Sequence, residues 1–221
     1  MQDSVEKSNP AKENHQKTSL EQWVEIISAV LISLATVASA WCAYQSALWG
    51  GEEAISYNAA SAARTESVRF SNQALQLTTI DVSMFTEFAA AYSNEDEFLF
   101  DFLMDRFRPE MKVAVEAWID TQPLLNPDAP PSPFDMEEYK SEAQDEADRF
   151  LEEVDRHIAE ARLNDQRADS YILLTVIFAS VLFFGGMSTE FKSLKIRVGL
   201  VAFSTLTFLI TLVIVITFPI I

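Results

Sequence analysis

Hydrophobic residues fall into three long runs, and polar sequence separates the first run from the other two. The first run covers residues 23–45, and a helix from Trp23 to Trp41 would rise about 27 Å, close to the ~30 Å hydrocarbon core of a bilayer. Aromatic residues at both ends of the run are typical of the belts at membrane surfaces. A polar tail, residues 1–22, precedes the run, so we expect a retained membrane anchor and not a cleaved signal peptide.

Two further uncharged runs cover residues 171–187 and 198–221, and a short basic loop, residues 188–197, joins them. Short basic loops stay on the cytoplasmic side of a membrane, and the lysines of the amino-terminal tail agree with this orientation. The pattern therefore predicts an all-α, multi-pass protein of the cell membrane with three transmembrane helices and a cytoplasmic amino terminus. The segment between the first two runs, residues 46–170, is expected on the extracytoplasmic side.

This middle segment has helical periodicity at both ends. A helix without proline is expected to continue from the first run to about Tyr92. A second long helix, capped by Asp135, is expected to run directly into the second apolar run. Its apolar stripe consists of Ala143, Ala147, Phe150, Val154, Ile158, Ala161, Ala168 and Ile172. The two helices predict an antiparallel hairpin that projects from the bilayer and is closed by a cap, residues 93–134.

Inside the cap, Ser93 is expected to begin one short helix, and Pro109 fits the first turn of another that ends near Asp120. Residues 121–134 hold five prolines and predict an extended connector.

Charge is distributed very unevenly along the chain. The net charge of the whole chain is −17, and residues 46–170 alone hold 27 acidic and 10 basic residues. So acidic a surface repels nucleic acid and attracts cations or basic partners. A role in nucleic-acid binding is therefore not expected.

Small residues form a seam along the first apolar run and just beyond it, at alternating spacings of four and three. The seam consists of Ala29, Ser33, Thr36, Ala40, Ala43, Ala47, Gly50 and Ala54. Small residues allow helix backbones to approach closely in lipid, where packing drives association. The seam packs either against the other two spans of the same chain or against its copy in a neighbouring subunit.

The cap is rich in aromatic residues, among them Phe98, Phe102, Phe107 and Trp118. Exposed clusters of this kind mark interfaces with a partner. The alternative is that the same side chains close the top of the hairpin's own core.

The segment carries no recognisable catalytic site. A di-iron centre needs two histidines in Glu-x-x-His pairs, whereas His157 is the one histidine in residues 46–170 and Glu153 lies four positions before it. No Gly-rich phosphate loop, nucleophile elbow or Cys/His metal cluster is present in the sequence, and the single cysteine, Cys42, lies in an apolar run. We expect no enzyme, no cofactor and no bound metal.

The stretch WCAYQSALWGGEEA, at the end of the first run, carries a W-x-x-Y-Q element formed by Trp41, Tyr44 and Gln45. With the order of the spans, it resembles an uncharacterised group of bacterial three-span membrane proteins with a domain of unknown function. The resemblance implies a bacterial cytoplasmic membrane and supplies no activity.

Two functions fit these patterns. In the first, the protein is a structural or accessory membrane component that assembles with copies of itself and presents its acidic domain to another membrane or extracytoplasmic protein. In the second, the assembly encloses an ion-conducting pore with an acidic vestibule. Span one offers few hydroxyls for such a pore, and those of span three are expected to bond back to their own helix.

Overall fold

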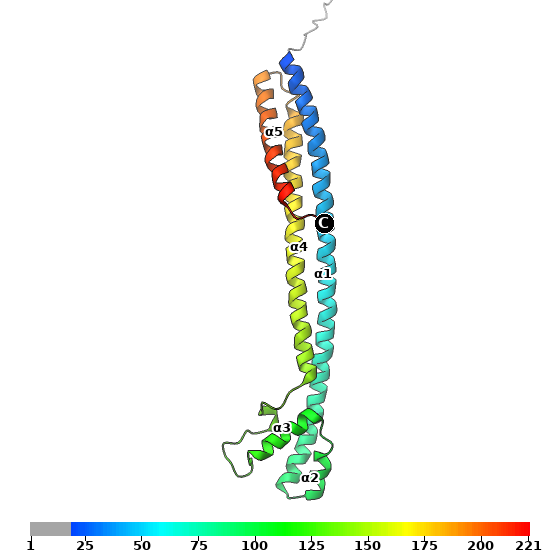
Figure 1. Ribbon diagram of the computed structural model, residues 1–221, viewed down its shortest axis with the longest axis vertical. Coiled ribbons are helices and arrows are strands. Elements are labelled where there is room, and N and C mark those ends of the chain that lie inside the picture. Colours follow the sequence, from blue (N-terminus) through cyan, green and yellow to red (C-terminus); the bar gives the residue numbers. More distant parts are fainter. Residues whose placement is uncertain (1–18) are drawn as a thin grey trace, which may run out of the picture. The chain divides into compact units, whose positions relative to one another are not determined.

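The computed structural model describes residues 19–221, and five α-helices account for most of that range (Figure 1). The helices are α1 (Ser19–Ser93), α2 (Glu97–Met104), α3 (Pro109–Asp120), α4 (Glu142–Met187) and α5 (Leu194–Thr217). A short 3-10 helix, η1 (Pro133–Asp135), interrupts the connector before α4, and residues 19–221 contain no strand. The predicted all-α class is confirmed. Most of the predicted polar tail, residues 1–18, lies outside the described residues.

Three of these helices, α1, α4 and α5, are long and apolar enough to cross a membrane, with mean hydropathies of 2.1, 2.0 and 2.5 in their most apolar segments. These are the three predicted spans. The helix of the third span begins at Leu194 and ends at Thr217. It stops there because Pro219 restricts the preceding residue, Phe218, to an extended conformation with φ −76° and ψ 147°.

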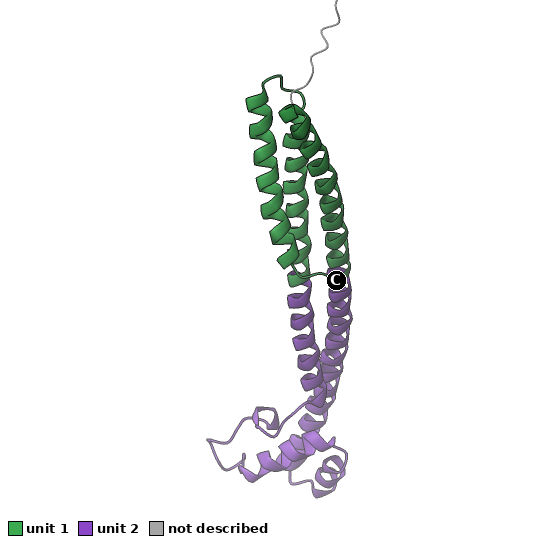
Figure 2. Cartoon of the chain, turned by 45° about the horizontal axis from the view of Figure 1, so that its top comes forward, with its two compact units in different colours: residues 1–52, 163–221 green, residues 53–162 purple. Residues whose placement is uncertain are grey.

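The chain divides into two compact units, which Figure 2 shows in different colours. Among the described residues, unit 1 comprises residues 19–52 and 163–221, and unit 2 comprises residues 53–162. Helices α1 and α4 contribute to both units.

Unit 1 is formed by three helices that pack side by side (Figure 2). Its core is lined by Leu31, Ala35, Cys42 and Trp49 from α1, by Ala168, Tyr171, Leu174, Phe178 and Val181 from α4, and by Phe208 and Val215 from α5. The Phe178 and Phe208 rings lie 5.7 Å apart. Gly185 allows α4 to approach α1 closely, because a Cβ atom there would lie 3.3 Å from the Ile32 side chain.

Polar contacts also join these helices near the α4–α5 turn. The Ser28 and Ser188 hydroxyls are 3.2 Å apart and buried. Arg197 donates to Glu25 over 3.2 Å, so the single acid within the first apolar run has a basic partner on α5.

In unit 2, the second half of α1 runs antiparallel to the first half of α4. Phe70 stacks on Phe150 with ring centroids 5.6 Å apart, and Tyr139 reaches Thr78 further along α1. Most of the predicted stripe of α4 is buried or half-buried, but Ile172 is 52% exposed and Tyr171 takes the core position in unit 1.

Two predicted helix starts are wrong. Ser93 is the last residue of α1, and Asp96 caps α2 instead, because its carboxylate accepts from the Leu99 N–H at 3.0 Å. Asp135 ends the 3-10 helix, and the chain is extended at Met136, so α4 begins only at Glu142. The helix bounds of α3 agree with the prediction.

Candidate functional site

The small-residue seam lies on an open face of α1. Gly50 is half-buried and the other seven residues of the seam are exposed. The buried positions of α1 in unit 1 lie on a different face: Val24, Ser28, Leu31, Ala35, Cys42, Gln45 and Trp49. The first of the two interpretations of the seam is that it packs against the other two spans of the same chain. In the described chain, helices α4 and α5 do not cover it.

The buried face of α1 holds the segment that follows α5. Gln45, which is fully buried, donates its amide N–H to the main-chain oxygen of Ile221 at 3.3 Å and accepts the Ile221 N–H at 3.2 Å. The Trp49 indole and the Tyr171 hydroxyl both donate to the Pro219 carbonyl, at 3.2 and 3.1 Å. The arrangement satisfies backbone groups that Pro219 removed from the helix.

This contact divides the residues of the W-x-x-Y-Q element by role. Gln45 is buried and binds backbone, whereas Trp41 and Tyr44 are 44% and 56% exposed. Sequence reasoning missed the role of Gln45, because its partner lies 176 residues away in the chain. A lone amide among apolar residues was the signal that could have found it.

The hydroxyls of span three bond back to their own helix, as predicted. Thr205, Thr207, Thr211 and Thr217 each donate to a carbonyl three or four residues before, over 2.7 to 3.0 Å. Ser204 is the exception, since its buried Oγ atom has no hydrogen-bond partner among the described residues.

A buried carboxylate on α1 organises unit 2. Asp81 is fully buried and accepts two hydrogen bonds from Arg108, from Nε at 3.1 Å and from Nη2 at 2.6 Å. Tyr139, in the connector before α4, lies within hydrogen-bonding distance of Asp81 and Thr78, 3.2 Å from each. The hydrogen bonds with Asp81 raise the pKa of the Arg108 guanidinium, so Arg108 stays protonated. Burial, above all, raises the pKa of the Tyr139 hydroxyl.

This network places α3 against α1, and the aromatic cap separates into two groups as a result. Phe107 and Trp118 are each 6% exposed and pack with Phe88, Met111 and Val115 in a core of their own. For Phe107 and Trp118, this burial agrees with the alternative that the aromatic side chains of the cap close a core of the chain itself, because the Arg108 tether directs α3 onto α1. Trp118 is held further by a hydrogen bond from its indole to the Pro130 carbonyl, at 2.8 Å.

Helix α2 behaves differently from α3, since none of its eight residues is buried although most are apolar. Phe98 is 81% exposed and Phe102 is 41% exposed. Their rings stack at 6.3 Å, and the Arg106 guanidinium lies 3.5 Å from the centre of the Phe102 ring.

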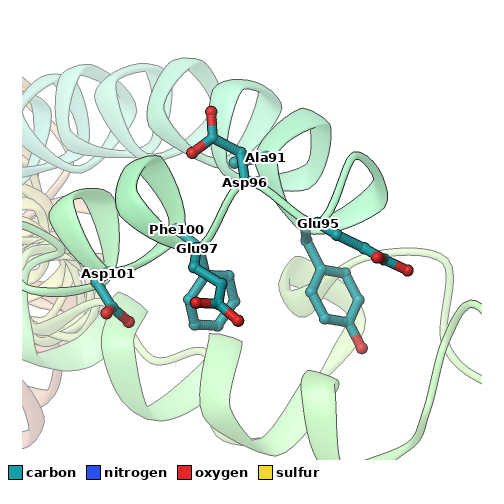
Figure 3. Close-up of a pocket in the computed structure, with 7 residues that line it drawn as sticks. Ala91, Glu95, Asp96, Glu97, Phe100 and Asp101 are labelled. Carbon is teal, nitrogen blue, oxygen red and sulfur yellow. The ribbon is translucent and has the colours of Figure 1, made fainter.

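Beside α2 lies a hollow of about 500 Å³, which we call the α1–α2 hollow (Figure 3). It is lined by Ala91, Tyr92, Glu95, Asp96, Glu97, Phe100 and Asp101. The Tyr92 and Phe100 rings lie 6.0 Å apart. Figure 3 shows Glu97 and Asp101 on the same side of α2 as Phe100, whereas the Asp96 carboxylate points away.

In the part of the chain that the structure describes, no three His, Cys, Asp or Glu side chains lie close enough together to hold a metal ion. His157 contacts Glu160 at 3.2 Å and lines a shallow hollow with Glu153 and Phe150. Comparison with known proteins found no matching family model, no matching curated protein and no matching solved structure.

Proposed function

We propose that this protein is a non-enzymatic, structural or accessory component of the cell membrane. It assembles with copies of itself and presents an acidic helical domain on the extracytoplasmic side to a partner. The observation that carries the proposal is the open face of α1, where seven small residues of the seam are exposed while a different face binds α4 and α5.

An open face of small residues suits self-association. Within a bilayer, burying apolar area does not drive two helices together, because lipid tails are equally apolar. Close backbone approach supplies the attraction instead, and alanine and serine side chains permit it. The alternating spacing of four and three is that of a left-handed helix pair, in which each seam residue meets its own copy across a twofold axis.

Crosslinking at single cysteines tests the seam directly. In a Cys42→Ala background, Ala40→Cys places a thiol on the seam, and Val37→Cys places one on an exposed position outside it. Oxidation in native membranes is expected to give a disulfide-linked dimer with Ala40→Cys and little with Val37→Cys, since the bond needs Cα atoms about 4.4 to 6.8 Å apart. Equal crosslinking of the two variants would argue for random collision.

The molecular mass of the assembly provides a second test of the seam. Ala40→Leu is expected to reduce the molecular mass of the protein in mild detergent, measured by light scattering, whereas Val37→Leu is expected to leave it unchanged. A monomeric wild-type protein that binds no partner would overturn the proposal.

The alternative function, an ion-conducting pore with an acidic vestibule, has weaker support. Ser33 and Thr36 donate their hydroxyls to carbonyls of their own helix, each at 2.8 Å, and Ser28 is buried against Ser188. Little polar surface is therefore left on span one to replace the hydration shell of an ion. Voltage-dependent ion flux through purified protein in liposomes would favour the pore over the structural role.

A further inference from the structure

Helix α2 leaves an apolar face without a partner in the described chain. Phe98 is 81% exposed, although its neighbours in the cap have a core available to them in which Phe107 and Trp118 are 6% exposed. An exposed phenylalanine that stacks on a second one, Phe102, forms an aromatic surface of the kind that anchors protein interfaces.

A cation already occupies part of this surface. The Arg106 guanidinium covers the Phe102 ring at 3.5 Å, one helical turn beyond it, and donates to the Phe102 carbonyl at 2.9 Å. The Phe98 ring, one turn before Phe102, has no such cover from any described residue. The intramolecular contact shows which chemistry this strip accepts, because ring faces attract guanidinium and ammonium groups.

The adjacent α1–α2 hollow has the matching charge. No hydrogen bond or ion pair from residues 19–221 reaches the side chains of Glu95, Glu97 or Asp101. Asp101 follows Phe98 by three residues and Glu97 by four, so it lies between the aromatic strip and the hollow on the helix surface. One ligand can therefore meet the strip and the hollow together.

We propose that this α2 surface, formed by Phe98, Phe102 and the α1–α2 hollow, binds a basic amphipathic helix of another protein. The inference rests on the proposed function and names the partner class. The apolar side of the partner helix covers Phe98. A lysine or arginine of the partner enters the hollow between Tyr92 and Phe100 and meets the carboxylates of Glu97 and Asp101. A second copy of this chain is disfavoured as the occupant of this surface, because its helices outside the spans belong to residues 46–170, which hold 27 acidic and 10 basic residues. An anionic membrane surface is disfavoured by the same repulsion.

The test uses the full chain in nanodiscs of phosphatidylcholine. The probe is a labelled synthetic amphipathic helix with leucine on one face and lysine and arginine on the other, and binding is followed by fluorescence anisotropy. We expect saturable binding that weakens as salt is added. The same peptide with glutamate in place of its basic residues is expected not to bind.

Matched variants separate a specific surface from diffuse attraction. The double variant Glu97→Lys/Asp101→Lys is expected to weaken peptide binding about tenfold. Phe98→Ser is expected to weaken it by the same factor, which is the loss expected for a hot-spot contact. The control pair Glu152→Lys and Asp155→Lys changes the net charge equally at exposed positions of α4, and Leu151→Ser removes another exposed apolar side chain. These controls are expected to change affinity less than about twofold.

Several outcomes would overturn the inference. Equal losses in the α2 pair and the α4 pair would mean diffuse electrostatic attraction, and an unchanged affinity of Phe98→Ser would remove the aromatic anchor. Equal binding of the peptide to empty nanodiscs would show that it binds lipid. A lower molecular mass of Phe98→Ser than of the wild type would show that the α2 surface binds a second copy of this chain. Crosslinking of Ala40→Cys reports on self-assembly independently, so failure of this inference is distinguishable from failure of the proposed function. The substituted side chains are exposed, and an unchanged melting temperature confirms that each variant folds.

Discussion

Each unit of this protein holds a non-helical segment against α1 with one fully buried polar side chain, but the two side chains differ in charge. Gln45 in unit 1 is a neutral amide that pairs with the backbone of Ile221. Asp81 in unit 2 is a carboxylate that pairs with Arg108 and Tyr139. Both side chains form hydrogen bonds with groups that lie outside the helices: the main chain of Ile221 in unit 1, and the side chains of Arg108 and Tyr139 in unit 2.

The difference follows from what surrounds each tether. Gln45 lies within an apolar span, where an unpaired charge costs far more free energy than an unpaired amide. One amide side chain also offers both a hydrogen-bond donor and an acceptor to an extended main-chain segment. Arg108 keeps 24% of its side chain exposed, so its charge is partly solvated while its fork binds Asp81 through two hydrogen bonds. The neutral side chain of Gln45 suits lipid, and the charged pair of Asp81 and Arg108 suits a unit with access to water.

The largest effect is expected from breaking the charged tether. Asp81→Ala leaves Arg108 half-buried, and among the described residues Glu110, at 3.2 Å, is then its remaining ion-pair partner. The variant is expected to lower the free energy of unfolding of unit 2 by about 3 kcal/mol. Chemical unfolding of the full chain, followed by the fluorescence of the buried Trp118, measures the change.

An exposed ion pair provides the control for this variant. Glu66→Ala removes the partner of Arg69, and both side chains of that pair are more than 40% exposed. The expected loss is under about 1 kcal/mol. Equal losses in the two variants would show that the burial of Asp81 does not matter.

The neutral tether is expected to give the next largest effect. Gln45→Leu removes both hydrogen bonds to the main chain of Ile221, at a cost of about 1 kcal/mol each and therefore about 2 kcal/mol together. Thermal unfolding in detergent and amide hydrogen exchange at Ile221 measure the loss. Gln76→Leu, at an exposed position of α1, is the control and is expected to change neither quantity.

Neither tether could be predicted from the sequence, although much of the fold could. The bounds of α3 follow from Pro109 at its first turn, and the length of α1 follows from the absence of a breaker. The late start of α4 did not follow, because Tyr139 is held by Asp81, a contact between residues 58 positions apart.

The candidate surfaces, like the two tethers, could be predicted only in part from the sequence. Periodicity identified the seam of α1, but both faces of that span are apolar or small, so the pattern could not decide which face binds α4 and α5. Composition identified the cap as aromatic. It could not separate the exposed Phe98 from the buried Trp118, because their burial depends on where Arg108 anchors α3.

The stability of unit 2 is expected to depend on pH through Tyr139, the second partner of Asp81. Burial raises the pKa of the Tyr139 hydroxyl above its ordinary value of about 10. The folded state therefore keeps this proton longer than the unfolded state, so the stabilisation is present below about pH 10 and is lost as the pH rises through the raised pKa.

Tyr139→Phe tests this effect and keeps the ring that packs edge-on against Phe134 at 5.0 Å. At neutral pH the variant is expected to lose about 1 kcal/mol for the missing hydrogen bond. Above pH 10 its stability is expected to fall less steeply than that of the wild type in urea unfolding followed by Trp118 fluorescence. Parallel curves for the two proteins would exclude Tyr139 as the titrating group.

The smallest effect concerns the turns that follow the long helices, where the two units again differ. After α4, the Ser188 and Thr189 hydroxyls donate to the Gly185 and Gly186 carbonyls at 2.6 and 2.8 Å. After α1, the Asp96 N–H donates to the Ala91 carbonyl at 3.0 Å in a Schellman arrangement, with Glu95 at φ 55° in the left-handed position that favours glycine.

Glu95→Gly removes the clash of Cβ in that conformation, which costs roughly 1 to 2 kcal/mol, but it adds freedom to the unfolded chain. The net result is expected to be a gain of about 0.5 kcal/mol in the unfolding free energy of unit 2, measured in urea. Glu97→Gly, in the first turn of α2, places the same residue where φ is helical and is expected to destabilise instead, by up to about 1 kcal/mol. A gain in both variants would trace the effect to the removal of a carboxylate from an acidic surface, and a gain in Glu95→Gly alone would trace it to the backbone.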